Sequence, residues 1–146
     1  MGVVRSCRNC GQKNRTAAGH LADTGRCGAC KAEFGPADEP IAVTTAQFDE
    51  IVQNAKVPVL VDFWAAWCGP CRAAAPEVAR AARDMAGQGV VLKVDTEAER
   101  ELASRYRIQG IPNFMVFAGG KAVHQQAGLV GHDVMEGWMR EAMRPV

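Results

Sequence analysis

From residue 41 onward, short apolar runs alternate with stretches whose apolar side chains recur at helical spacing. A short apolar run bounded by turn residues predicts a buried strand, and apolar positions at i, i+3, i+4 and i+7 predict an amphipathic helix. The predicted strands are 41–43, 57–64, 90–94, Asn113–Ala118 and Lys121–Ala127. The predicted helices begin at Thr44, cover 72–86, run from Thr96 to about Tyr106, and begin again at Asp133.

Three of these helices start with a capping pattern, in which Thr or Asp is followed three residues later by Gln or Glu. The pairs are Thr44 with Gln47, Thr96 with Glu99, and Asp133 with Glu136. Pro76 is expected to kink helix 72–86, and Gly87 is expected to end it. The closing helix is expected to bury one apolar stripe, which comprises Val134, Met135, Trp138, Met139, Ala142 and Met143.

The predicted elements follow the order β-α-β-α-β-α-β-β-α. Parallel neighbours need a helical crossover, whereas only Gly119 and Gly120 join the last two strands, which therefore form an antiparallel hairpin. The order predicts an α/β fold with a mixed sheet and helices on both faces.

The first 40 residues follow no such pattern. Between residues 5 and 34 the only large apolar side chains are Leu21 and Phe34. They are too few to build a core without a stabilising cross-link such as a bound metal or disulfides. Residues 36–40 contain two prolines and two acidic side chains and are predicted to be a linker. The predicted organisation is a four-cysteine module at 1–35, this linker, and an α/β domain at 41–146.

Composition is that of an ordinary globular protein, with 48% hydrophobic and 23% charged residues in a chain of 146. A net charge of +1 gives no general electrostatic reason to expect nucleic acid or an anionic membrane as a partner. No apolar run approaches the roughly 18 residues of a membrane helix, and residues 1–7 lack the apolar core of a secretory signal. We therefore expect a cytoplasmic protein whose six cysteines are metal ligands or redox groups rather than structural disulfides.

Four of the cysteines, Cys7, Cys10, Cys27 and Cys30, form two Cys-x2-Cys pairs separated by sixteen residues. This spacing is typical of structural zinc sites, in which four thiolates surround one Zn²⁺ as a tetrahedron. We predict one structural zinc ion here, with two disulfides or two reactive dithiols as the alternatives. His20 lies between the pairs and is predicted to be a solvated loop residue rather than a ligand.

The other two cysteines belong to Cys68-Gly69-Pro70-Cys71, where strand 57–64 meets helix 72–86. The free N–H groups and positive dipole end of a helix favour the thiolate of Cys68, and Cys71 stands within disulfide reach. Pro70 suits the start of a helix, and Gly69 leaves room for a partner. We predict thiol–disulfide exchange in which Cys68 attacks and Cys71 resolves the mixed disulfide. A metal half-site or an inert buried pair is the alternative.

Asp62 is an acidic residue inside the otherwise apolar strand 57–64. A buried carboxylate is costly, and burial raises its pKa towards the range of a general acid–base group. Because it precedes Cys68 by six residues, we predict that Asp62 lies beneath the following helix and exchanges a proton with Cys71. The alternative is a structural aspartate that accepts backbone hydrogen bonds at a strand end.

The run Trp67-Cys68-Gly69-Pro70-Cys71 resembles the thioredoxin family over residues 40–144, with matching spacings for Asp62, Trp64, Pro76, Lys93, Pro112, Gly120 and Gly128. The resemblance implies the thioredoxin fold and a monomeric protein-disulfide reductase with no organic cofactor. It also implies disulfide-containing protein substrates and a thioredoxin reductase as electron donor. The four-cysteine module, a small zinc-ribbon-like unit, resembles the extension of the thioredoxin 2 type, a bacterial cytosolic form.

The resemblance also implies roles for residues far from the cysteines in sequence. Pro112 would be cis and would pack beside the cysteines, and the backbone of Ile111 would pair with an extended substrate segment. Trp67 and Gly128 would line the docking surface, together with Gly69 and Pro70 of the motif, and Lys93 would tune Asp62. Two positions depart from the family: Ala66 replaces a frequent proline, and Asn113 replaces the usual threonine.

Other functions remain open at this stage. The four-cysteine module could be an adaptor that docks a protein or nucleic acid through its basic residues, which are Arg5, Arg8, Lys13, Arg15, Arg26 and Lys31. Phe34 is the only aromatic residue of the module, too few for a base-stacking surface, which argues against nucleic acid as the partner. Alternatively, oxidation of the four thiolates could release zinc and regulate activity. An oxidase or isomerase is the nearest enzymatic alternative, because the direction of exchange depends on redox potential.

Overall fold

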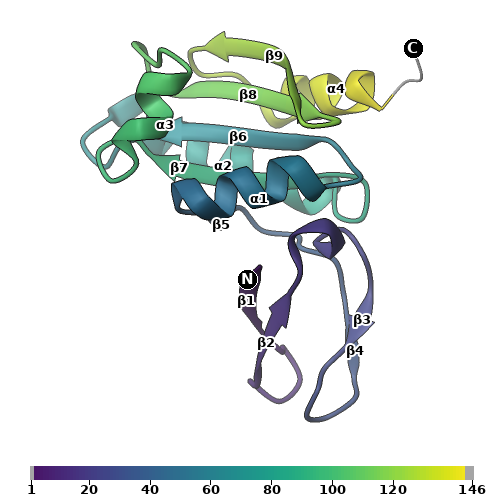
Figure 1. Ribbon diagram of the computed structural model, residues 1–146. Helices are drawn as coiled ribbons and strands as arrows, with labels where there is room; N and C mark the ends of the chain where they lie inside the picture. The colour runs from purple at the N-terminus through teal and green to yellow at the C-terminus, as the bar shows by residue number, and fades with distance from the viewer. Residues whose placement is uncertain (1, 144–146) are drawn as a thin grey trace.

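The computed structural model describes residues 2–143, which form a mixed five-stranded sheet covered by helices and a smaller lobe beside it (Figure 1). The lobe contains β1 (Val3–Ser6), β2 (Lys13–Thr16), the 3₁₀ helix η1 (Ala18–His20), β3 (Gly25–Arg26) and β4 (Glu33–Phe34). The sheet contains β5 (Ile41–Ala42), β6 (Val59–Trp64), β7 (Val90–Asp95), β8 (Asn113–Ala118) and β9 (Lys121–Ala127). The helices are α1 (Thr45–Asn54), α2 (Gly69–Asp84), α3 (Arg100–Arg105) and α4 (His132–Ala142). No helix within residues 2–143 is long and apolar enough to cross a membrane.

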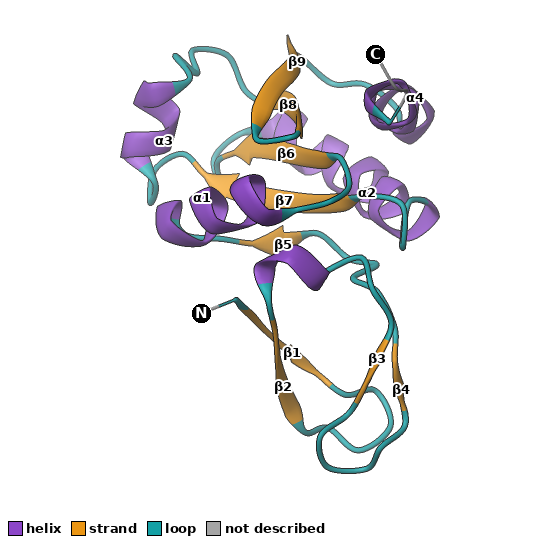
Figure 2. Ribbon diagram, turned by 45° about the vertical axis from the view of Figure 1, so that its right-hand side comes forward, coloured by secondary structure: helices purple, strands orange, loops and turns teal. Residues whose placement is uncertain are grey.

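The sheet has the order β5-β7-β6-β8-β9, in which β5, β7 and β6 are parallel and β8 and β9 run antiparallel to their neighbours. Helices α1 and α3 lie on one face, and α2 and α4 lie on the other (Figure 2). The predicted order of elements and the mixed sheet are confirmed.

Strand β6 occupies the centre of the sheet and points alternate side chains to opposite faces. Val61 and Phe63 pack in the apolar cluster beneath α1, whereas Leu60 packs with Ala74 of α2. The same alternation places Asp62 on the α2 face. Both edges of β6 are paired and both faces are covered, which fixes the strand that leads into the Cys68 motif.

The start of α2 differs from the prediction, because the helix begins at Gly69 rather than at residue 72. Cys68 is its N-cap residue, and Pro70 occupies the second position of the first turn, where no backbone donor is required. The capping box predicted for α1 is confirmed: Thr44 Oγ1 accepts from the Gln47 N–H, and the Gln47 side chain accepts from the Thr44 N–H.

The capping pattern predicted at Thr96 and Glu99 is wrong. The N-cap residue of α3 is Glu99, and its side chain makes no capping bond. Instead, Glu99 Oε1 accepts from the backbone and hydroxyl of Thr45, while the Thr96 hydroxyl donates to the Trp64 carbonyl. Tertiary partners therefore replace the local cap.

The pattern predicted at Asp133 and Glu136 is also wrong, because α4 begins after Gly131 without a side-chain cap and Glu136 is buried. The predicted stripe is only partly buried. Met135 and Met139 are fully buried, whereas Val134 is 41% exposed and Met143 is 46% exposed. The helix therefore turns a narrower apolar face towards the sheet than the sequence indicates.

The N-terminal lobe packs against the sheet domain through η1, which lies against α1 in both ribbon views (Figures 1 and 2). Leu21 is 1% exposed and belongs to the same apolar cluster as Phe48 of α1. The Ala37 N–H donates to the Leu21 carbonyl over 2.8 Å, and Arg8 pairs with Asp38 over 2.6 Å. The two parts share a core, and the predicted linker is held on the lobe. The division into two domains stays a prediction, and its ends, Met1 and residues 144–146, lie outside the described residues.

Candidate active site

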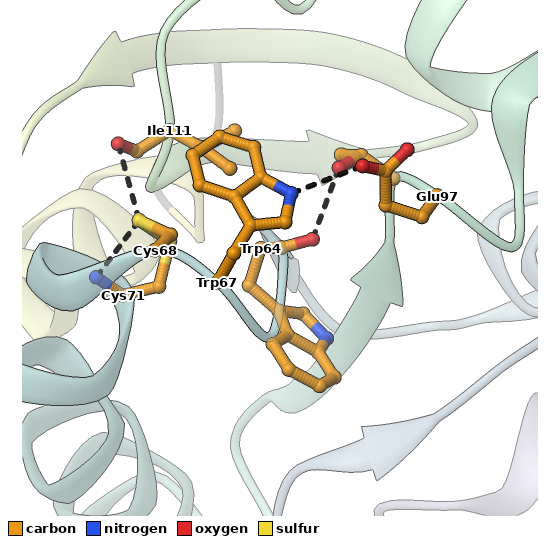
Figure 3. Close-up of a disulfide and its surroundings, with 7 residues drawn as sticks. Trp64, Trp67, Cys68, Cys71, Glu97 and Ile111 are labelled. Carbon is orange, nitrogen blue, oxygen red and sulfur yellow. Dashed lines mark hydrogen bonds between the residues drawn. A yellow bond between two sulfur atoms is a disulfide. The ribbon is translucent and has the colours of Figure 1, made fainter.

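Cys68 and Cys71 form a disulfide at the N-terminal end of α2 (Figure 3). Their Cα atoms lie 5.2 Å apart, and the Cys71 N–H donates to Cys68 Sγ over 3.1 Å. This hydrogen bond exists because Cys68 is the N-cap residue, whose side chain faces the unpaired N–H groups of the first turn. The same N–H is positioned to stabilise a thiolate at Cys68 once the disulfide opens.

The disulfide lies in a small apolar cluster with Ala65, Trp64 and Ile111. Cys68 is 3% exposed and Cys71 is 5% exposed, so both cysteines are largely buried at this end of α2. The Ile111 carbonyl oxygen lies 3.6 Å from Cys68 Sγ. The Ile111 backbone therefore borders Cys68 Sγ.

The loop beside the disulfide contains a cis peptide bond between Ile111 and Pro112, as the family resemblance implies. The Gly128 N–H donates to the Pro112 carbonyl over 2.8 Å, which ties this loop to the end of β9. Gly128 has φ of +103°, a conformation that favours glycine. Gly69 is also exposed, and a Cβ added there would meet nothing within 4 Å.

Trp67 stands above the disulfide and is 66% exposed, although it is a large aromatic residue. Its indole N–H donates to Glu97 Oε1 over 3.0 Å, and Figure 3 shows the ring edge directed at that carboxylate. No pattern in the sequence indicated this role for Glu97. It lies 30 positions away, so that only the folded loop after β7 brings the two side chains together.

Asp62 and Lys93 occupy paired positions on β6 and β7 and point to the α2 face. Asp62 is 2% exposed, and its Oδ1 atom has no hydrogen-bond partner among residues 2–143. Burial raises the pKa of the Asp62 carboxyl to about 7, and the charge of Lys93 opposes part of this shift. Lys93 Nζ also lies 4.5 Å from the ring centre of Trp64, which packs on the disulfide.

A second group of side chains gathers the four remaining cysteines at the tip of the N-terminal lobe. Cys7 Sγ lies 3.7 Å from Cys30 Sγ, and Cys10 Sγ lies 3.6 Å from Cys27 Sγ. All four sulfurs lie within 4.8 Å of one another. A tetrahedral zinc site with Zn–S bonds of about 2.3 Å requires sulfur–sulfur separations of about 3.8 Å. The cluster therefore has the dimensions of a four-thiolate metal site.

Hydrogen-bond donors surround these sulfurs. The Ala29 N–H and Asn14 Nδ2 both donate to Cys27 Sγ, and Asn9 Nδ2 donates to Cys30 Sγ. Backbone donation from Cys30 and the bond from Asn14 lower the pKa of the Cys27 thiol to about 6. Such donors support a set of metal-bound thiolates. His20 is separate from this cluster, with Nδ1 2.6 Å from Asp23 Oδ2.

A redox-active cysteine pair at a helix N-terminus, beside a cis-proline loop and on a mixed sheet of this order, defines a protein thiol–disulfide oxidoreductase. The thioredoxin family model matches residues 39–141, and the chain belongs to the thioredoxin family. The fold is the thioredoxin fold.

Individual relatives agree with this assignment. Thioredoxin C-3 of Corynebacterium nephridii is 32% identical over 142 residues, which is 97% of each chain. Thioredoxin 1 of Nostoc sp. is 47% identical over 88 residues, 60% of this chain and 82% of the relative. A mutant thioredoxin from Halobacterium salinarum NRC-1 superposes with a TM-score of 0.69 at 32% identity, covering 75% of this chain and 96% of that structure. The match to the Corynebacterium protein extends through the N-terminal lobe.

Proposed function

We propose that the chain is a protein-disulfide reductase in which Cys68 is the nucleophile and Cys71 the resolving cysteine. The observation that carries this proposal is the N-cap position of Cys68, whose sulfur accepts the Cys71 N–H. Disulfide-containing proteins are the proposed substrates, a thioredoxin reductase is the proposed electron donor, and the cytoplasm is the proposed compartment. Reduction of insulin disulfides by the dithiol form tests the activity.

The reaction follows from these positions in two exchange steps. The Cys68 thiolate attacks one sulfur of the substrate disulfide, forms a mixed disulfide and releases the other substrate sulfur as a thiolate. Cys71 then loses its proton and attacks Cys68 Sγ, which closes the Cys68–Cys71 disulfide and releases the second substrate thiol. Two electrons pass from the dithiol to the substrate. The proposed proton acceptor for Cys71 is Asp62, on the face of the sheet that α2 covers.

We assign the substrate surface to the residues around the disulfide. An extended substrate segment would hydrogen-bond the Ile111 backbone beside Pro112, as strand addition does elsewhere. The exposed ring of Trp67 and the backbone at Gly128 would form the walls, and the open space at Gly69 would admit the substrate sulfur. Lys93 would limit the rise in the pKa of Asp62, since its ammonium favours the ionised carboxylate.

Replacing Asp62 by Asn is expected to change the pH dependence of stability. The folded-state pKa of Asp62, about 7, exceeds the ordinary value of 3.8. The folded state therefore keeps a proton that the unfolded state loses, and stability falls as the pH rises from about 4 to 7. Asp62→Asn removes this loss, which raises the free energy of unfolding at pH 8 by on the order of 4 kcal/mol. Urea denaturation at pH 4 and pH 8 measures the difference.

Asp62→Asn should also slow resolution of the mixed disulfide, by about 100-fold if the carboxylate acts as a general base. Asp133→Asn is the matched control, because it removes an exposed carboxylate from α4. The control should keep both the pH profile of stability and the rate. If the free energy of unfolding depends on pH in the same way in wild type and in Asp62→Asn, the raised pKa of Asp62 is contradicted.

We infer that the four-cysteine cluster holds one structural Zn²⁺. Its sulfur separations and its donors to Cys27 and Cys30 fit four thiolates around one ion. The two hairpins of the lobe, β1–β2 and β3–β4, are too short to be stable alone, so a bound ion would supply the missing stability. The adaptor and zinc-release hypotheses for this module stay predictions.

A further inference from the structure

Glu136 is a buried carboxylate that the disulfide chemistry does not use. Glu136 is 5% exposed and lies one turn after the start of α4, between the buried residues Met135 and Met139. A carboxylate out of water is unfavourable unless a cation or several donors compensate it. Arg140 approaches Glu136 Oε1 only to 3.5 Å and is itself 55% exposed, so it compensates the carboxylate weakly, and the nearer partner is the imidazole of His132, which hydrogen-bonds Oε2.

Two further metal-ligating side chains converge on Glu136. His132 Nδ1 lies 3.0 Å from Glu136 Oε2 and 3.8 Å from Asp84 Oδ2. His132 and Glu136 are at positions i and i+4 of α4 and therefore share one face, while Asp84 is the last residue of α2. The three ligand atoms lie within 4.8 Å of one another.

We propose that Asp84, His132 and Glu136 form a second metal site, which takes one divalent transition-metal ion of the Zn²⁺ type between α2 and α4. Zinc bonds to nitrogen and carboxylate oxygen of about 2.0–2.2 Å place neighbouring ligand atoms about 3.3–3.5 Å apart. The 3.0 and 3.8 Å separations bracket this range. One imidazole with two carboxylates suits zinc better than the oxygen-seeking Mg²⁺ or Ca²⁺.

The surroundings supply an outer set of contacts for such an ion. Arg80 Nε lies 3.0 Å from Asp84 Oδ2 and orients the carboxylate. The backbone N–H of His132 donates to Glu77 Oε1 over 2.9 Å, which fixes the first residue of α4 against α2. A bound ion would link the far end of the active-site helix α2 to α4. The site has three protein ligands against four in the cysteine cluster, so it binds more weakly.

The experiment is a Zn²⁺ titration of the full-length, tag-free protein. The four-cysteine cluster is first loaded with one equivalent, and the Cys68–Cys71 disulfide is kept closed so that neither thiol binds metal. Competition with a chromophoric chelator should reveal one further equivalent. His132→Ala and Asp84→Asn should each weaken this second equivalent by about tenfold or more, since outer partners alone contribute 10–100-fold at metal sites.

His20→Ala is the matched control, because it also removes a histidine paired with a carboxylate. His20 Nδ1 lies 2.6 Å from Asp23 Oδ2, but neither residue belongs to the groups of metal-ligating side chains found among residues 2–143. This variant should keep the second equivalent. Circular dichroism verifies that each variant is folded. With the four-cysteine cluster already loaded, the second equivalent of Zn²⁺ should raise the melting temperature of wild type but not that of His132→Ala. The proposal is overturned if no second equivalent binds, or if it binds equally well to His132→Ala and Asp84→Asn.

Discussion

Replacing Cys68 by Ser should reduce insulin disulfide reduction by at least about three orders of magnitude, as loss of the nucleophile does in other covalent catalysts. A serine hydroxyl keeps the N-cap hydrogen bond to the Cys71 N–H but cannot exchange with a disulfide. The fold should therefore remain intact while the chemistry is lost. Turbidity or thiol release with insulin as substrate, under a constant supply of reductant, measures the rate.

The matched comparison is Cys71→Ser, which keeps the attacking sulfur and loses the resolving one. It should also fail in multiple turnovers, yet consume one substrate disulfide per molecule in a single-turnover assay. Cys68→Ser should show no such single event. Substantial turnover by Cys68→Ser would mean that another cysteine attacks the substrate, and the assignment of roles would be wrong.

Removal of the metal from the four-cysteine cluster should unfold the N-terminal lobe and weaken the sheet domain. The lobe contributes Leu21 to the core beneath α1, where it lies in one cluster with Phe48. Losing this burial is comparable to truncating a core leucine and should cost about 2–5 kcal/mol. Thermal denaturation before and after chelation, together with hydrogen exchange of residues 3–34, measures both effects.

Cys27→Ser should reproduce the effect of chelation, because Cys27 is fully buried within the cluster. Cys68→Ser is the control, since it also removes one sulfur but lies outside the cluster, and it should keep both the metal and the protected lobe. Equal melting temperatures and equal exchange in metal-loaded and metal-free protein would show that the lobe folds without an ion.

Local patterns predicted the elements whose causes are local. The hairpin Asn113–Ala118 and Lys121–Ala127 has the predicted bounds, because Gly119 and Gly120 adopt positive φ values of 60° and 81° at the turn. The Thr44 cap is likewise self-contained within one turn. The spacing of the first four cysteines was sufficient to predict that they gather at one point.

The errors concern side chains whose partners are distant in sequence. Thr96 binds the Trp64 carbonyl 32 residues away, and Glu99 binds Thr45 54 residues away, so both leave the cap that their spacing suggested. Glu136 matches a capping pattern, yet it is buried beside His132 and near Asp84 of another helix. Such contacts form only when β6, β7, α2 and α4 pack together. The spacing of residues along the sequence therefore does not predict them.

The docking of the lobe is a similar case. Composition around Pro36 and Pro40 predicted a linker, but nothing in the local pattern indicated that Leu21 would enter the core beneath α1. A single leucine in a polar segment is an ordinary surface residue in many proteins. Its burial depends on the close approach of η1 to α1, which the fold of the four-cysteine module determines.

The central claim is that Cys68 attacks and Cys71 resolves, and trapping the intermediate tests it most directly. Cys71→Ser, incubated with a disulfide peptide and analysed by mass spectrometry after digestion, should carry one peptide half on Cys68. The four other cysteines should remain unmodified when the metal is bound. An adduct on Cys10 or Cys30 instead, or no adduct on Cys68, would contradict the account.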